Sequence, residues 1–498
     1  MIGLLLGLAF AAPISTDASE LVGDSDAAET SATVASMEGP DRSAPPQVLP
    51  PSPLDLPSPD IHELSPGLNV HHLRIPGVRK AHVKVVFRRG ALELHGGSNA
   101  VFTVTGLAWD QATLSTSADD LARLQDLHEV EVFSDGGLQA ASVRCVTPVD
   151  NLPVGLGLLR QVLFEPKFRR KDIQQFRQRW QRWYLSEAPT RSDSITDSVL
   201  VHGWYPKGHP YASRPDLAGW RDVSRGDVLR THARLIAESP VDVMVVADLP
   251  WTELEPMLRE ALEGLGATGA LPVAPVVDPP VKTRVIGVHL GATKQASIAL
   301  RLPAPRFDDP DAAAMYAVDW ALGGGFLSRL NSNLREEKGL TYGISSDYAA
   351  HIGRGSWTVR TQVKAEELGV AVKEIEREID GVVSDGLTEQ ELADALAGRI
   401  TRWNGTLASA HSASSVYGSM QRHRRSVAEV RERLDAIADV DLVEAQRVAA
   451  RWFASDQPRL WVIVGDQKKL EPLLDELGWD VRWMPSELTV LGILHLDP

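Results

Sequence analysis

One segment of the chain, residues 323–343, carries side chains that could act on a peptide. Its sequence is GGGFLSRLNSNLREEKGLTYG, which places Arg335 seven residues before Tyr342. A guanidinium group donates hydrogen bonds in a fixed fork that suits peptide carbonyl oxygens. A phenol can donate to the oxygen that becomes negative when a peptide carbonyl is attacked. The pair could therefore contact a peptide substrate, but from these two residues alone a surface arginine beside a half-buried strand tyrosine is the favoured interpretation.

The local pattern predicts a helix over 326–337, a short loop, and then a strand that carries Tyr342. Three apolar residues at i, i+4 and i+8 should form one buried stripe: Phe326, Leu330 and Leu334. Arg335 follows this stripe by one position and should point away from it, and Gly339 stands where a helix C-cap is expected. The glycines at 323–325 are not a phosphate loop, because no Gly-Lys-Ser/Thr follows them. Close backbone packing or approach of a substrate explains them better.

The whole segment closely resembles the C-terminal-half signature of the insulinase-like zinc metallopeptidases, the family of pitrilysin and the mitochondrial processing peptidase. The resemblance covers about residues 60–485. It implies an α+β fold in which two homologous α/β domains are joined by a linker and close like a clam. It also implies that Arg335 and Tyr342 contact the substrate peptide.

The zinc motif of that family, His-x-x-Glu-His on a helix, is missing. In the motif two imidazoles bind zinc from one helix face, and the glutamate activates the water. The motif usually follows a Gly-Leu-Ala-like turn, and here residues 106–108 (GLA) precede Trp109, with Ala112 and Thr113 at the positions of the glutamate and the second histidine. Tryptophan has no acceptor nitrogen for a metal, and none of the 14 histidines begins such a motif.

Glu187 stands at about the family's spacing for the third zinc ligand. One carboxylate does not hold a catalytic zinc, so we interpret Glu187 as a surface residue. The helix predicted over 170–185 carries Trp180, Trp183 and Tyr184. These rings could fill a lost active site, but we favour an ordinary core role for them.

The chain also contains an internal repeat, which supports duplicated halves. PVDVMVVAD at 240–248 recurs as PRLWVIVGD at 458–466, and a Leu-Glu-Pro triplet follows each copy, at 254–256 and 470–472. Strands and helices alternate without the glycine signatures of βαβ units. We therefore predict two α+β halves rather than a doubly wound sheet.

Composition divides the chain further. The first twelve residues are apolar, with AFA at 9–11, and predict a signal peptide and export to the periplasm or the extracellular space. An acidic segment rich in proline and serine follows and is typical of a disordered tether. The predicted order is signal peptide 1–12, tether 13–59, N-terminal peptidase-like domain 60–270 with the degenerate zinc motif, linker 271–280, and C-terminal peptidase-like domain 281–498.

Charge and cysteine content exclude several classes of protein. A chain of 498 residues is too long for one core, and its net charge of −15 argues against a nucleic-acid partner. The single cysteine, Cys145, excludes an intrachain disulfide. Its strand-like surroundings favour a buried residue over a catalytic thiol. We see no other apolar stretch that could span a membrane.

Together with the missing zinc motif, the resemblance implies a non-catalytic subunit of a heterodimeric insulinase-like metallopeptidase, inactive by itself. The chain would hold no cofactor, a partner subunit would carry zinc, and Arg335 and Tyr342 would contact a peptide or unfolded polypeptide. The main alternative is a peptide-binding or structural scaffold without any proteolytic role. A metallopeptidase with an unusual site of its own is a third, less favoured possibility.

Overall fold

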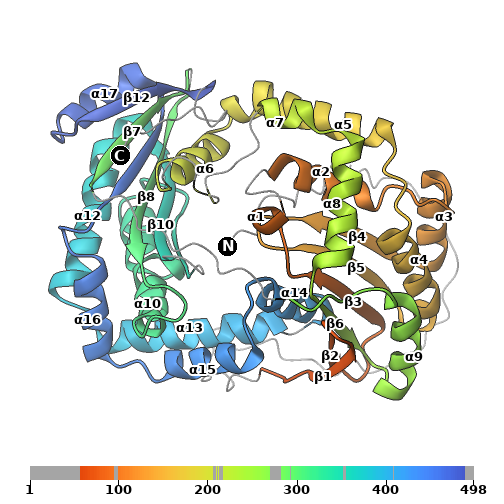
Figure 1. The fold of residues 1–498 in the computed structure, drawn as a ribbon. Helices are drawn as coiled ribbons and strands as arrows, with labels where there is room; N and C mark the ends of the chain where they lie inside the picture. The colour runs from red at the N-terminus through yellow and green to blue at the C-terminus, as the bar shows by residue number, and fades with distance from the viewer. Residues whose placement is uncertain are drawn as a thin grey trace, which may run out of the picture. The chain divides into compact units, whose positions relative to one another are not determined.

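Figure 1 shows the computed structural model of the chain, which describes residues 56–94, 99–205, 209, 211, 217–269, 282–291, 293–350, 355–407 and 409–487. The predicted signal peptide at 1–12 and linker at 271–280 lie outside the described residues, as does the tether up to residue 55. No described helix is long and apolar enough to cross a membrane.

The first half forms a six-stranded sheet with the order β1-β2-β6-β3-β5-β4. Its strands are β1 Asp60–Ser65, β2 Leu68–Arg74, β3 Lys80–Phe87, β4 Glu131–Gly136, β5 Ala141–Pro148 and β6 Val241–Ala247. Strands β2 and β6 are parallel, and the other neighbours are antiparallel. Every residue of β6 is buried, because this strand is covered on both faces.

The second half forms another six-stranded sheet, with the order β12-β7-β11-β8-β10-β9. Its strands are β7 Arg284–His289, β8 Gln295–Ala304, β9 Ile344–Ala349, β10 Gly355–Lys364, β11 Leu460–Gly465 and β12 Val481–Pro485. Strand β7 is parallel to both β11 and β12, and the remaining pairs are antiparallel. All residues of β11 are buried, like those of β6.

The two sheets repeat one arrangement, which confirms the predicted duplication and the α+β class. The repeated sequences at 240–248 and 458–466 contain the equivalent strands β6 and β11. Each of these strands has one parallel neighbour, β2 or β7, and one antiparallel neighbour, β3 or β8. The outermost strands break the symmetry, because β1 is antiparallel to β2 whereas β12 is parallel to β7.

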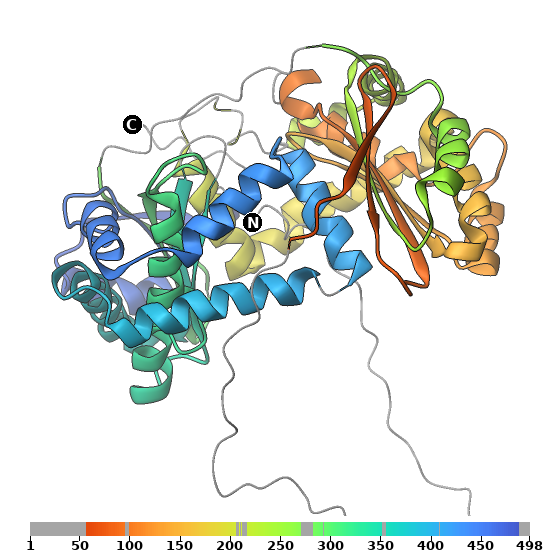
Figure 2. The same ribbon diagram turned by 90° about the horizontal axis from the view of Figure 1, so that it is seen from below.

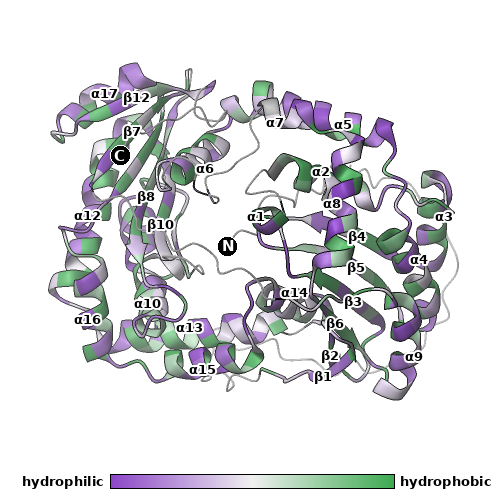
Figure 3. Cartoon of the chain, viewed as in Figure 1, coloured by the Kyte–Doolittle hydropathy of each residue, from purple (hydrophilic) through white to green (hydrophobic). Residues whose placement is uncertain are grey.

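Helices fill the connections between the strands. Those of the first half are α1 Ala91–Leu94, α2 Asn99–Trp109, α3 Ala118–His128, α4 Leu152–Phe164, α5 Arg170–Arg182, α6 Ser192–His202, α7 Leu217–Asp222, α8 Arg225–Glu238 and α9 Trp251–Leu262. Those of the second half are α10 Ala312–Asp319, α11 Arg329–Asn331, α12 Leu368–Ser384, α13 Glu389–Leu407, α14 Ala410–Arg422, α15 Val427–Ala438, α16 Leu442–Trp452 and α17 Gln467–Asp475. Wider π-helical turns occur at η2 Trp183–Glu187, η5 Trp320–Gly324 and η6 Ser332–Glu337. Helix α5 is largely hydrophilic (Figure 3).

Each half contributes one helix to the other half's sheet. Helix α6 packs on β8 and β11, where Ile195 and Val199 are buried. Helix α14 packs on β3 and β6, and Tyr417 is buried in the same cluster as Met244 of β6. The two helices occupy corresponding places in the repeat, so the duplication includes this exchange as well as the sheets.

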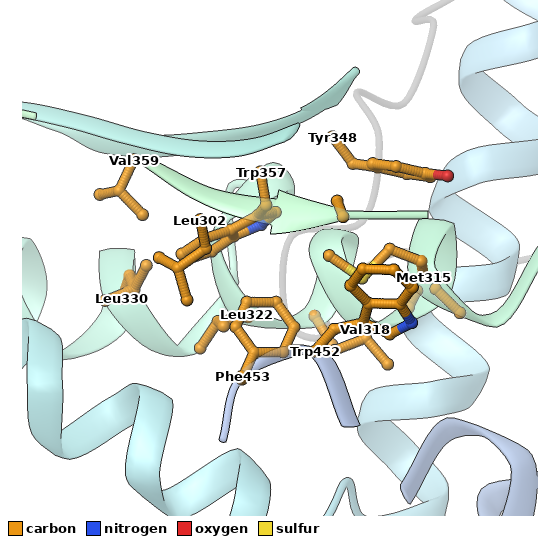
Figure 4. Close-up of a cluster of buried hydrophobic side chains, with 14 of the residues drawn as sticks. Leu302, Met315, Val318, Leu322, Leu330, Tyr348, Trp357, Val359, Trp452 and Phe453 are labelled. Atoms are coloured by element: carbon orange, nitrogen blue, oxygen red, sulfur yellow. The ribbon is translucent and has the colours of Figure 1, made fainter. Parts of the chain in front are cut away.

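The core of the second half surrounds Trp357 of β10 (Figure 4). The ring of Phe453 meets it edge to face, with 4.8 Å between the ring centroids. Leu322 and Leu330 belong to the same cluster and are fully buried. Leu322, just before the segment predicted to bind a peptide, and Leu330 within it therefore fix the first part of that segment to this core.

The tether prediction is wrong at its last residues. Leu56 is 2% exposed and lies in the core cluster of the second half. Arg431 donates a hydrogen bond to the carbonyl of Leu56, and the hydroxyl of Tyr417 donates to that of Pro57. The composition of 13–59 gave no sign of this, because the burial of Leu56 depends on contacts with the distant second half.

The structure agrees with the interpretations made from sequence for Cys145 and for Trp180 on the helix predicted over 170–185. Cys145 is buried, and burial raises the pKa of its thiol to about 12. The thiol is therefore protonated at neutral pH and is a poor nucleophile. Trp180 stacks on Trp220 with 5.4 Å between the ring centroids, at the border of the first core.

Candidate functional site

The peptide-binding segment begins differently from the prediction. Its helix starts at Arg329 rather than at Phe326, and runs through α11 and η6 to Glu337. Gly325 has an extended backbone conformation, which interrupts the helical conformation between η5 and this helix. Leu330 and Leu334 are fully buried as predicted, but Phe326 is 66% exposed and does not belong to the stripe. Helical spacing failed for Phe326 because the helix does not reach it.

The glycines at the start of the segment allow close packing. A Cβ atom on Gly323 would stand 2.6 Å from the hydroxyl of Ser346 and 3.0 Å from Leu330. A Cβ on Gly325 would stand 3.0 Å from the carbonyl oxygen of Trp320. Side chains at these positions would push strand β9 and the helix away from η5. Close packing, one of the two explanations offered from sequence, is therefore confirmed.

Two stretches of this part of the chain, η5 and η6, are π-helical turns, which are wider than an α-helix. Gly325 donates its backbone N–H to Trp320 at 2.9 Å, and Lys338 donates to Asn333 at 3.0 Å, each a bond across five residues. Such π-helical turns are rare and are frequent at functional sites. Gly339, with φ +61°, then ends the helix in the left-handed region, as predicted for a C-cap.

The buried side of the helix is anchored by polar contacts. Arg329 makes a two-pronged ion pair with Glu391 of α13, at 2.5 and 2.7 Å. Asn333 donates to Glu374 and Glu378 of α12, at 2.8 and 2.7 Å. These bonds fix the register of the helix against α12 and α13 of the second half.

Asn331 connects the two ends of the exposed surface. Its side-chain amide donates to the carbonyl of Phe326 at 2.6 Å. Its side-chain oxygen accepts from the backbone N–H of Ile344 at 3.5 Å. The loop of Phe326 and the start of β9 are thus held together by one buried side chain.

Arg335 is partly exposed and Tyr342 is almost fully exposed. The guanidinium carbon of Arg335 lies 4.7 Å from the centroid of the Phe326 ring, and its Nε is 3.2 Å from a carboxylate oxygen of Glu336. Tyr342 is 94% exposed. No contact between Arg335 and Tyr342 occurs in the structure as described.

Tyr342 lies in a loop, so its predicted place on a strand is wrong. Strand β9 begins at Ile344, two residues later. Thr341 is buried, accepts the backbone N–H of Gly343 at 3.1 Å and contacts the hydroxyl of Thr361 at 2.9 Å. This turn, which alternation along the sequence does not reveal, places the Tyr342 side chain outside.

The three positions of the missing zinc motif are buried in the first half, and Trp109 belongs to its core cluster. Trp109 is fully buried and donates its indole N–H to the carbonyl of Val162 at 2.8 Å. Its ring contacts His232 edge to face at 5.0 Å. Burial lowers the pKa of His232 to about 4, with the carbonyl of Leu163 opposing the shift, so its ring is neutral at pH 7.

The backbone at these positions also departs from the motif's geometry. Helix α2 ends at Trp109, and the preceding Gly106 lies inside the helix rather than in a turn. Ala112 accepts a backbone hydrogen bond from Lys167 at 2.9 Å, and Thr113 forms an isolated bridge with Pro166. Ala112 and Thr113 are therefore off the helix, and no shared helix face is available to the three positions.

Glu187, the expected remnant of the third ligand, is exposed at the end of η2. This agrees with its interpretation as a surface residue. Sequence reasoning missed two other groups, namely Phe326 beside Arg335 and a cluster of Asp60, His62 and His72 on β1 and β2. Two features of the sequence could have indicated these groups. Glycines stand directly before Phe326, and Asp60 and His62 are two residues apart, as side chains on one face of a strand are.

A family comparison covers the segment that contains Arg335 and Tyr342. The model of the family described as "Peptidase M16 inactive domain" matches residues 222–398. Over this segment the chain is similar to insulinase-like (M16) peptidases. The chain contains no His-x-x-Glu-His motif.

The chain is similar to curated relatives that are described as uncharacterized zinc proteases. Over 104 residues it is 32% identical to one from Streptomyces coelicolor, covering 21% of this chain and 23% of the relative. Over 296 residues it is 23% identical to one from Mycobacterium tuberculosis, covering 56% of this chain and 65% of the relative. The matches thus span less than two thirds of each relative's length.

Several solved structures share the fold of this chain. A peptidase M16 inactive domain from Pseudomonas fluorescens has a TM-score of 0.73 at 18% identity, covering 82% of this chain and 98% of that one. A protease from Helicobacter pylori gives 0.72 at 18% identity, with coverage of 82% and 100%. The periplasmic protease PqqL from Escherichia coli gives 0.68 at 13% identity, with coverage of 88% and 49%. At these identities the likeness concerns the fold alone.

Proposed function

We propose that this peptidase homologue is the non-catalytic subunit of a heterodimeric insulinase-like metallopeptidase. Arg335 and Tyr342 contact the substrate, a peptide or unfolded polypeptide, and a zinc-bearing partner supplies the metal and the activated water. The peptidase homologue alone cleaves no peptide under this proposal.

The exposure of Tyr342 is the observation that carries the proposal. At 94% exposure the ring contributes almost nothing to the packing of this chain. Two other large apolar side chains of the same segment are also exposed, Phe326 at 66% and Leu327 at 82%. Exposed aromatic groups beside an arginine are the residue types enriched at binding surfaces.

The anchoring of the segment supports binding by a preformed surface. The Arg329–Glu391 pair and the buried Leu330 and Leu334 hold the helix beneath the exposed side chains. A hydrogen-bond donor on a fixed element loses less entropy when it binds than one on a mobile loop. Only the outer ends of Arg335 and Tyr342 would need to be ordered by a ligand.

The state of the zinc-motif positions supports a partner as the source of zinc. Trp109 and Thr113 are buried and hydrogen-bonded within the chain, and Ala112 offers no ligand atom. If the substrate surface serves hydrolysis, the metal has to come from another subunit. A pseudo-symmetric pair of such folds could supply the large interface that this requires.

Export belongs to the same proposal. The apolar residues 1–12 predict it, and a protease similar in fold, PqqL, is described as periplasmic. Fractionation of cells that produce the full chain tests this part, with recovery in the cytoplasmic fraction as the contrary result.

The central experiment is reconstitution with a zinc-bearing subunit. We expect the peptidase homologue to co-purify from its native cells with a chain that carries His-x-x-Glu-His. In the purified complex, Tyr342→Phe should lower kcat by roughly 100- to 1,000-fold, the usual cost of losing an oxyanion donor. Arg335→Ala should also raise KM, because its donors hold the peptide before and during the reaction.

A matched control is available on the first half. Among the residues that the structure describes, the exposed Arg123 pairs only with Asp120 on its own helix α3, at 2.9 Å, and Arg123→Ala should leave both constants unchanged. Complex formation is checked by size for each variant. Unchanged hydrolysis in both Tyr342→Phe and Arg335→Ala would reject the subunit proposal. It would favour the scaffold alternative, in which the surface binds peptides without cleavage.

A further inference from the structure

The edge hairpin of the first sheet brings together three metal-ligating side chains. Strand β1, the outermost strand (red-orange in Figure 2), pairs with β2 in a register that sets Asp60 opposite His72. His62 follows Asp60 by two residues and therefore lies on the same face of β1. One ligand atom from each of the three side chains lies within 4.8 Å of those of the other two.

His72 occupies a place where an apolar residue would be expected. Leu68, Val70 and His72 alternate along β2 on the same face, and Leu68 and Val70 belong to the first core. The His72 residue is only 4% exposed. A polar ring in such a row costs free energy unless its nitrogens are satisfied.

Both histidines keep one nitrogen unused. Neither the Nε2 of His62 nor that of His72 has a hydrogen-bond partner among the residues that the structure describes, and both atoms are buried. Native structures rarely leave such atoms without a partner. One ring nitrogen from each histidine and the Asp60 carboxylate together form a donor set that zinc prefers.

The rings are held in place by other contacts. His72 interacts through its remaining ring nitrogen with the backbone of Leu249. His62 stacks on Trp251, the first residue of α9, with 3.7 Å between the ring centroids and 5° between the planes. Metal-binding histidines are commonly oriented in this way, with the second nitrogen fixed by a backbone group.

We propose that Asp60, His62 and His72 bind a divalent zinc-type ion. Tetrahedral coordination at about 2.0–2.2 Å places donor atoms roughly 3.3–3.6 Å apart. The exposed Asp60 can close the remaining distance by rotation, because no core packing restrains it. Three protein ligands leave a fourth position for water.

The site lies away from the degenerate zinc motif. Helix α2, which ends at Trp109, packs on β4, whereas β1 forms the opposite edge of the same sheet. If a metal binds here, the sequence-based prediction of a chain without metal is wrong, but the catalytic zinc motif is still missing. It would fasten edge strand β1, which pairs on one side only, to β2.

Zinc content of the purified chain, free of any affinity tag, tests the proposal. After equilibration with micromolar zinc and gel filtration, we expect about one zinc per chain. His62→Asn and Asp60→Asn should each weaken zinc binding by at least about 100-fold, more than the loss of an outer-shell partner costs. These two residues are not fully buried, so both variants should fold even if His72→Asn does not.

His71→Asn is the matched control. His71 stands on the same strand but on the other face, with its Nε2 3.5 Å from Asp242, so the variant should keep its zinc. Cobalt(II) substitution should give the visible absorption of a tetrahedral site in the parent and in His71→Asn. Zinc should also raise Tm in these two chains and not in His62→Asn, because binding favours the native state.

Two results would overturn the proposal. One is the absence of zinc binding by the parent chain at micromolar concentrations. The other is stoichiometric zinc that persists in His62→Asn and Asp60→Asn, since the metal would then be bound by other residues. Neither result depends on peptide hydrolysis, so the test is independent of the subunit function.

Discussion

The guanidinium of Arg335 lies over the ring of Phe326, 4.7 Å from its centroid, on the exposed side of the second half. Phe326 is therefore not a misplaced core residue. Its ring supports the arginine from one side, while Glu336 restrains the guanidinium from another. This contact gives Arg335 a preferred orientation before any ligand binds.

Phe326→Ala should weaken peptide binding without unfolding the chain. An exposed cation–π contact contributes about 0.5–1 kcal/mol, so KM in the reconstituted complex should rise by roughly 2- to 5-fold. Phe326→Trp should preserve the effect, because indole is the best partner for a cation. Leu327→Ala, the adjacent exposed residue, serves as control. An equal rise in KM for Leu327→Ala would show general loss of apolar surface instead.

Glu391 should make stability depend on pH below neutrality. Burial alone would raise the pKa of Glu391, but hydrogen bonds from Arg329 and Thr388 outweigh it and lower the pKa from 4.5 to about 2. The ionised form is thus favoured in the folded state. Its contribution is complete above about pH 4.5 and is lost as the pH falls through about 2.

Glu391→Gln tests this by denaturant unfolding at several pH values. At pH 7 the variant should be less stable by about 1–2 kcal/mol, a value reduced for partial exposure of the pair. The difference from the parent should shrink between pH 4.5 and pH 2. A difference that stays constant over this range would mean that the carboxylate charge is not what matters.

Restoring the zinc motif by substitution should fail. A chain with Trp109→His, Ala112→Glu and Thr113→His should bind no more zinc than its parent, because helix α2 ends before the second and third of these positions. It should also lose stability, since removing a buried tryptophan ring typically costs about 3–5 kcal/mol. Elemental analysis and thermal unfolding measure both effects. One additional zinc per chain would show that the helix extends when ligands are present.

Leu56→Ala should destabilise the chain by about 2–3 kcal/mol, as expected for truncation of a buried leucine. Leu56 is 2% exposed, whereas Leu127 on α3 is 72% exposed, so Leu127→Ala should change stability by less than about 0.5 kcal/mol. Urea unfolding of the two variants makes the comparison. Equal losses of stability in the two variants would show that Leu56 belongs to the tether and not to the core.

The duplicated fold could be predicted because its signals are local. The repeated strands β6 and β11 are continuous apolar runs bounded by polar residues, and such runs indicate a strand covered on both faces wherever they occur. The absence of the zinc motif could also be predicted, because it depends only on the residue types at Trp109, Ala112 and Thr113. These inferences needed only the residue types and their order in the sequence.

Other features depended on contacts between residues far apart in the sequence, which no local pattern contains. The place of Phe326 beside Arg335 follows from the break at Gly325, and the loop position of Tyr342 follows from a turn at Thr341 that Thr361 of β10 completes. Likewise, Asp60, His62 and His72 meet only because β1 and β2 pair in one register. The sequence determined which elements form and which zinc ligands are missing. The tertiary structure decided which polar side chains face one another, because that depends on register, turns and packing between distant elements.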